Sequence, residues 1–163
     1  MPDHLPMNIQ LTALICGILL FALTQPLQSS QNTESMQIAS VIFANNVKID
    51  AEIADNETLR QNGLMHRKHL AENHGMLFVY PGQAIRAVWM KNTLIPLDVL
   101  FLSENGKIVS LLRGLTPCEQ TPCPISRSST DAHYMLEVNA GFIDRHRIKV
   151  GQGTIIDYKH SPK

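Results

Sequence analysis

The chain has 163 residues, of which 44% are hydrophobic and 17% are charged. Fourteen basic residues balance fourteen acidic ones, so the formal net charge is zero when histidine is neutral. This balance, without any block of basic residues, argues against a nucleic-acid-binding surface and against a polybasic membrane patch. We therefore expect no nucleic-acid partner, and contact with a membrane only through the N-terminal segment.

An apolar run from Leu11 to Leu23 dominates this N-terminal segment. The run is shorter than the roughly 20 residues of a membrane-spanning helix and fits the apolar region of a secretory signal. No lysine or arginine precedes it, and translation could start at Met1 or Met7. The pattern predicts an exported protein, periplasmic or extracellular, in which residues 1–24 are a signal peptide or an N-terminal anchor.

Residues 25–35 are rich in Gln, Ser and Asn, which predicts a disordered leader, and residues 36–160 then form the folded domain. Residues 36–43 and 47–54 are predicted to form a hairpin, because the second arm alternates apolar and polar residues and an Asn pair suits the turn. A short helix is expected at 55–63, where Asp55 or Asn56 suits the N-cap and Gly63 suits the left-handed stop.

Short strand-like segments account for most of the remaining chain. A Glu-Asn-Gly turn at 104–106 is expected to join two of them as a hairpin. Many short strands with few helices predict a mainly β, single-domain fold, either a sandwich or a partly closed barrel with one or two short helices. The further predicted elements are strands at 76–80, 85–90, 97–103, 107–112, 133–139 and 154–158, and one helical turn at 140–146.

Polar groups interrupt the apolar stretch from Trp89 to Asp98, which contains Lys91 and Asn92, and Glu137 interrupts a later predicted strand. Apolar surroundings imply burial, and buried charges must be paired or hydrogen-bonded. One interpretation is an ion-paired lattice that fixes the strand register. The other is a ligand site in which an aromatic ring stacks on the ligand and polar groups hydrogen-bond to it. The candidate ligand-binding residues are Arg67, Trp89, Lys91, Asn92, Asp98, Glu137 and Asn139.

Two alternative functions remain open. A small hydrolase could use Asp98 and Glu137 as an acid/base pair, which requires carboxyl groups about 5–9.5 Å apart. Copper handling could use a methionine and histidine cluster, because thioethers suit the cuprous ion and imidazoles suit both copper states. The plainer interpretation of this cluster is core methionines beside solvated histidines. Its members are Met65, His66, His69, His74 and Met76.

Ser128, Asp131 and His133 have the residue types of a catalytic triad, but no G-x-S-x-G motif accompanies them. Cys118 and Cys123 have C-x4-C spacing in a proline-stiffened loop. Behind an export signal this spacing favours a disulfide, since exported compartments are oxidising. A metal or redox role for these cysteines is less favoured, because the loop contains no histidine and has no helix-start context.

Several further motifs follow one another along the chain: Arg60 before Gly63-Leu64-Met65-His66-Arg67, then Gly75-Met76-Leu77-Phe78, Trp89-Met90-Lys91-Asn92-Thr93, Pro96-Leu97-Asp98, Pro117-Cys118, Cys123-Pro124 and Leu136-Glu137-Val138-Asn139-Ala140-Gly141. In type and order, these motifs resemble those of the domain-of-unknown-function family 192. The resemblance covers about residues 38–158 and implies a small jelly-roll-like β domain, often exported, with no established activity. We therefore expect a non-enzymatic binding or accessory module of the cell envelope, with an unknown small-molecule or protein ligand and neither a cofactor nor a metal.

Overall fold

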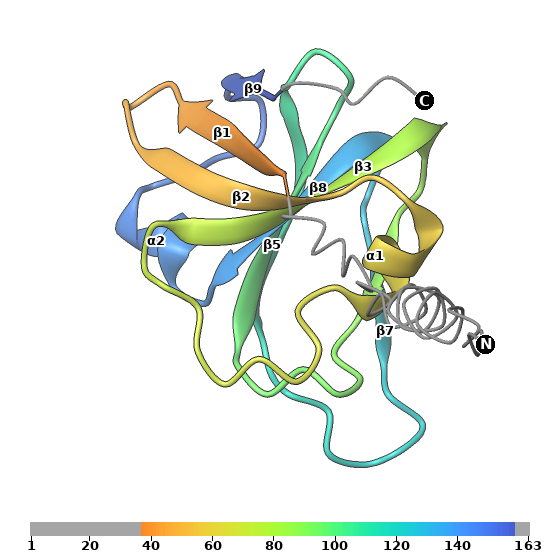
Figure 1. Ribbon diagram of the computed structural model, residues 1–163. Coiled ribbons are helices and arrows are strands. Elements are labelled where there is room, and N and C mark those ends of the chain that lie inside the picture. Colours follow the sequence, from red (N-terminus) through yellow and green to blue (C-terminus); the bar gives the residue numbers. More distant parts are fainter. Residues whose placement is uncertain (1–36, 159–163) are drawn as a thin grey trace, which may run out of the picture. The chain divides into compact units, whose positions relative to one another are not determined.

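Nine strands and two short helices make up residues 37–158, which are the residues that the computed structural model describes (Figure 1). The predicted signal peptide and leader fall outside these residues, so that part of the sequence analysis stays a prediction. Within residues 37–158, no helix is long and apolar enough to cross a membrane. The elements are β1 (Ile38–Phe43), β2 (Lys48–Ala54), α1 (Glu57–Asn62), β3 (His74–Ala84), β4 (Ala87–Trp89), β5 (Leu97–Leu102), β6 (Ile108–Leu115), β7 (Ile125–Arg127), β8 (Ala132–Asn139), α2 (Phe142–Arg145) and β9 (Thr154–Asp157).

Seven of the strands form one curled sheet in the order β6-β5-β8-β3-β2-β1-β9, and β4 and β7 form a small separate sheet. Neighbouring strands are antiparallel except β2 and β3, which run parallel. A bridge between Lys107 and Gly153 brings the starts of the two edge strands, β6 and β9, together. The domain is therefore a half-barrel, which confirms the predicted mainly β fold and corresponds to the partly closed barrel.

The curled sheet buries apolar side chains on both of its faces. Successive side chains of a strand point to opposite faces, so neighbouring residues of the central strands join different clusters. On β5, Leu100 belongs to one cluster and Val99 to the other, and on β8 the same holds for Leu136 and Met135. We call these the Leu100 cluster and the Val99 cluster. The face on which a polar residue of β5 or β8 lies can therefore be read from the cluster of its apolar neighbours on the strand.

The local predictions made from turn and cap residues are confirmed. The strands β1 and β2 form the expected hairpin. At the start of α1, Asn56 is the N-cap, and its side-chain oxygen accepts a hydrogen bond of 2.9 Å from the Leu59 N–H. Gly63 ends the helix with a positive φ of 48°. Gly106, with a φ of 74°, lies in the turn between the antiparallel strands β5 and β6.

Two features of the fold were not predicted. The strand β7 lies inside the Pro, Cys and Ser-rich segment, is only three residues long and shows no apolar alternation. Its partner β4 lies about three dozen residues earlier, so the pairing is not local. The parallel pairing of β2 with β3 is a second non-local feature, because a connection that contains α1 carries the chain across between them.

Candidate functional site

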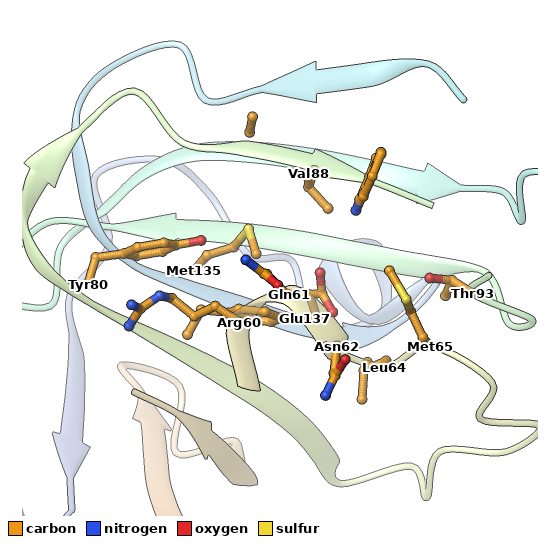
Figure 2. Close-up of a pocket in the computed structure, with 14 residues that line it drawn as sticks. Arg60, Gln61, Asn62, Leu64, Met65, Tyr80, Val88, Thr93, Met135 and Glu137 are labelled. Atoms are coloured by element: carbon orange, nitrogen blue, oxygen red, sulfur yellow. The ribbon is translucent and has the colours of Figure 1, made fainter. Parts of the chain in front are cut away.

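A pocket of about 80 Å³ lies between α1 with its following loop and the strands β3, β4 and β8. Figure 2 shows Glu137 and Met135 of β8 extending into it together with Tyr80 of β3. From α1, Arg60 and Gln61 form part of the wall. The walls are therefore polar side chains mixed with aromatic and sulfur-containing ones, and they come from segments far apart in the sequence.

Glu137 is the most unusual member of the pocket. It is only 6% exposed and pairs across the sheet with Met76 on β3 and Val99 on β5. Its carboxyl group therefore lies on the face of the Val99 cluster. Among the described residues, neither a hydrogen bond nor an ion pair reaches this carboxyl. Burial raises its pKa from an ordinary 4.5 to about 8, because desolvation disfavours the charged form. Glu137 is thus mostly protonated at neutral pH.

Aromatic rings flank the pocket. Trp89 lines it while remaining 46% exposed, which places this ring at the rim. The ring of Tyr80 lies 5.5 Å from the Arg60 guanidinium carbon and 3.9 Å from that of Arg86. Burial raises the pKa of Tyr80, an effect that the charge of Arg86 opposes. The tyrosine therefore stays a neutral hydroxyl group well into the alkaline range.

The polar side chains of α1 are held by neighbours outside the pocket. Arg60 Nη1 donates hydrogen bonds to the carbonyl oxygens of Asp55, at 2.8 Å, and Val79, at 2.9 Å. Arg60 Nη2 lies 3.3 Å from a carboxylate oxygen of Glu57, and Gln61 donates to the other oxygen at 2.9 Å. These contacts fix the helix against β3, so the guanidinium group of Arg60 is committed away from Glu137.

Asp98 has a structural role instead. It is 1% exposed, and its Oδ1 accepts a hydrogen bond of 2.8 Å from the Gly114 N–H. Its Oδ2 accepts one of 2.9 Å from the Ile143 N–H at the start of α2. Two backbone donors satisfy the carboxylate, and within the described residues it forms no ion pair with Lys91. Asp98 therefore joins β6 and α2 to β5.

The predicted acid/base pair of Asp98 and Glu137 is contradicted by the strand register. Asp98 lies directly opposite Val138, and Val99 lies directly opposite Glu137. Cross-strand partners share a face and neighbouring residues do not. The two carboxyl groups therefore point to opposite faces of the sheet, and one substrate cannot reach both.

The remaining cationic and amide candidates lie away from the pocket. Arg67 forms a bidentate ion pair with Glu52. Asn139 donates hydrogen bonds of 2.9 and 3.1 Å to the carbonyl oxygens of Leu70 and Ala71. Both side chains thus hold strands or loops in place. The ion-paired lattice is wrong for Asp98 and Glu137, since Arg67 contacts neither of them.

Lys91 and Asn92 lie beside the rim rather than inside the pocket. Both are exposed, and Lys91 Nζ lies 5.1 Å from the centre of the Trp89 ring. Asn92 adopts a positive φ of 55°, and its carbonyl accepts a hydrogen bond of 2.8 Å from the His66 N–H. Of the seven candidate ligand-binding residues, the pocket therefore brings together Trp89 and Glu137.

The disulfide is present as predicted. Cys118 and Cys123 are bonded with a Cα–Cα distance of 5.8 Å. The Cys118 N–H donates to the Met90 carbonyl at 3.2 Å, and a bridge pairs Cys118 with Lys91. The disulfide loop is therefore attached to the segment that follows Trp89, next to the rim of the pocket.

The candidate copper ligands are divided between core and surface. Met76 is buried in the Val99 cluster, whereas His66, His69 and His74 are exposed. The described residues contain no group of three or more His, Cys, Asp or Glu that could hold a metal ion. The candidate catalytic triad is not supported by the position of its serine. Ser128 is buried, and its Oγ accepts a hydrogen bond of 2.9 Å from the Arg86 N–H.

Sequence analysis missed Gln61, Tyr80 and Met135 as pocket residues. Each belongs to a different element, and the spacing between them carries no periodic signal. Several of the sequence motifs did point to this region, since Leu64, Phe78 and Thr93 also line the pocket. As a whole, the lining of the pocket depends on the tertiary arrangement of α1, β3 and β8 and could not be predicted from the sequence.

The family model DUF192, described as an uncharacterized ACR, matches residues 40–156. The chain belongs to the DUF192 family. This confirms the resemblance found in the sequence motifs. The comparison with curated proteins gives no match.

Two crystal structures are similar to this DUF192 chain. One, described provisionally as a transcription regulator from Sinorhizobium meliloti 1021, is 31% identical, covers 75% of this chain and 94% of that chain, and has a TM-score of 0.67. The other is a protein of unknown function from Novosphingobium aromaticivorans DSM 12444. It is 25% identical, covers 76% of this chain and 89% of that chain, and has a TM-score of 0.67.

Proposed function

We propose that this DUF192 protein is an exported, non-enzymatic binding module of the cell envelope, and that its Glu137 pocket receives a small polar group of the ligand. The observation that carries the proposal is the buried carboxyl group of Glu137, which faces the pocket without a partner among the described residues. Its oxygens are not sealed in the core, because Ser40 Oγ is the single fully enclosed side-chain oxygen without a partner among the described residues. They open into the pocket, where loss of water without a hydrogen bond still costs free energy. Such groups are kept at functional sites more often than in a purely structural core.

The dimensions of the pocket limit what can enter it. Its volume of about 80 Å³ is well below the roughly 300–1,000 Å³ of sites that enclose a drug-sized ligand. Only the end of a ligand fits inside, and the rest must lie outside against the rim. Trp89, half exposed at that rim, offers an aromatic surface for this outer part.

A binding role fits the site better than a catalytic one. Among the described residues that line the pocket, Glu137 is the sole carboxyl group. The second carboxylate of the hydrolase hypothesis, Asp98, lies on the other face of the sheet. The description of the Sinorhizobium structure as a transcription regulator is not carried over to this chain, because fourteen basic residues balanced by fourteen acidic ones do not favour DNA binding.

Export is proposed on two independent grounds. The apolar run from Leu11 to Leu23 is typical of a secretory signal. The disulfide between Cys118 and Cys123 suits an oxidising compartment outside the cytosol. Fractionation of cells that express the full chain, followed by N-terminal sequencing, tests this part. Protein found only in the cytosol with its N-terminus intact would contradict export.

The binding role is tested with small polar fragments. The chain contains one tryptophan, so its intrinsic fluorescence reports on the rim of the pocket. Amines, alcohols, amides and carboxylic acids of three to five carbons are titrated while fluorescence and backbone amide NMR shifts are recorded. We expect one class to give saturable changes that cluster on α1, β3 and β8. If no class moves these signals, the pocket is not a binding site.

A further inference from the structure

The carboxyl group of Glu137 determines which ligand group can be stabilised in the pocket. Ionised, it is an acceptor only, and within the described residues neither a hydrogen bond nor an ion pair reaches it, although it is buried in the pocket. A ligand that fits must therefore bring its own donors. The contrast with Asp98 is direct, since that buried carboxylate receives two backbone N–H groups.

We propose that the pocket binds the primary ammonium end of an alkylamine, with Glu137 as the counter-ion. This inference rests on the proposed binding function. An ammonium group supplies three N–H donors and one positive charge in a compact head. The pocket volume of about 80 Å³ suits such a head with the first methylene groups of its chain.

The rim favours the same chemistry. The face of an indole ring attracts cations, and Lys91 already holds its own ammonium group 5.1 Å from the centre of the Trp89 ring. An aliphatic stem that leaves the pocket can pack on this ring. Where Glu137 is ionised, a carboxylate ligand would meet it as a like charge, and an alcohol would bring only one donor.

Three cations lie around the pocket, and each of them is held by a neighbour other than Glu137. Arg60 on α1 is turned to backbone carbonyls and to Glu57. Tyr80 on β3 has its pKa raised further above 10 by burial. The Arg86 guanidinium carbon lies 3.9 Å from the centre of the Tyr80 ring, and Lys91 Nζ lies 5.1 Å from the centre of the Trp89 ring.

Ammonium binding must be coupled to proton release from Glu137. Burial raises the pKa of this carboxyl group to about 8, whereas the ligand binds to its ionised form. Below pH 8, the ionised fraction rises about tenfold for each pH unit, so the affinity should rise equally. Above pH 8 it should level off, and a primary amine with a pKa near 10.4 is still charged there. The same pH series is measured on the Glu137→Gln variant, so that the contribution of every other pH-dependent group is subtracted.

The test uses three probes of the same shape: butylamine, butan-1-ol and butyrate. Each is titrated into the purified protein at pH 6, 7, 8 and 9, with pocket amide shifts and calorimetry as readouts. We expect butylamine to bind best, with affinity rising about tenfold per pH unit up to pH 8 and one proton released. Glu137→Gln should weaken butylamine binding at least tenfold at pH 8, whereas the exposed control Glu104→Gln should leave it unchanged.

The failure of this inference and that of the binding function give different results. If butan-1-ol or butyrate binds as tightly as butylamine and the affinity does not depend on Glu137, the ammonium assignment is wrong and the binding pocket stands. If neither the three probes nor the small amides of the fragment series shift the pocket signals, both are wrong. Where butylamine does bind, a blocked lysine, Nα-acetyl-lysine amide, separates two sources of the amine. Equal binding of the two probes indicates a lysine side chain of a protein as the ligand. Binding of butylamine alone indicates a free amine.

Discussion

Replacing Glu137 by glutamine should stabilise the protein at pH 8 and leave its stability unchanged near pH 4.5. Glutamine has nearly the shape of a protonated glutamate but never carries a charge. The parent carboxyl group is 6% exposed, and burial raises its pKa from 4.5 to about 8. At pH 8 the folded parent must therefore either keep a proton on Glu137 that the unfolded chain releases, or bury the charge of the ionised carboxylate. The variant does neither.

The sign and the size follow from proton linkage. Between pH 4.5 and about 8, the folded protein binds a proton at Glu137 that the unfolded chain has lost, so the stability of the parent falls as the pH rises. Each pH unit of this interval costs about 1.4 kcal/mol. The interval from 4.5 to about 8 therefore costs about 5 kcal/mol, and the loss is complete at about pH 8. The variant should exceed the parent by this amount at pH 8 and by about 3 kcal/mol at pH 7.

The measurement is the free energy of unfolding from denaturant titration at pH 5, 6, 7 and 8. The informative quantity is the difference between variant and parent, because the other titrating groups cancel in it. Glu104→Gln serves as the control: this exposed glutamate should give a difference that stays within about 0.5 kcal/mol at every pH. A Glu137→Gln variant that is less stable than the parent at pH 8 would refute the reasoning, since the ionised carboxyl group would then have donors.

The remaining predictions concern residues outside the pocket, and each is checked by denaturant titration. Asp98→Asn should lose roughly 2 kcal/mol or more, because its NH2 group must face one of the two backbone N–H donors. A loss below about 0.5 kcal/mol would contradict this role. Serine at both Cys118 and Cys123 should cost about 2 kcal/mol on the chain-entropy model, and native protein should show no free thiol at these positions before reduction. Lys91→Met should stay within about 0.5 kcal/mol, since an exposed lysine contributes little.

Local features of this fold could be predicted from the sequence because their signals are local. The β1–β2 hairpin follows from alternation and an Asn pair, and α1 follows from the cap residues Asn56 and Gly63. The strand β3 begins earlier and ends later than predicted, running from His74 to Ala84. The extension beyond Tyr80 contains a proline and a glycine, which ordinarily end a strand. Here a register shift in the pairing with β8 accommodates them.

The pocket could be predicted only in part. Trp89 and Glu137 stood out because a large aromatic and a charge interrupt apolar segments. Arg67, by contrast, was a candidate because it was an available cation, and its partner Glu52 is as ordinary in the sequence as any other surface glutamate. The sequence offers a cation many carboxylates. The pairing of Arg67 with Glu52 depends on the chain crossover between β2 and β3. That crossover leaves no mark in residue periodicity.

Asp98 and Glu137 show where sequence reasoning reaches its physical limit. Each is a single acidic residue in a buried apolar strand, so their sequence signatures are the same. Asp98 meets N–H donors that lie 16 and 45 residues further along the chain, whereas no hydrogen bond from a described residue reaches the carboxyl group of Glu137. Neutral amides at the two positions should therefore act in opposite directions at pH 8: Asp98→Asn destabilises and Glu137→Gln stabilises. If both substitutions destabilised the protein, Glu137 would be a second structural carboxylate, and the pocket would lose the reason for assigning it a cationic ligand.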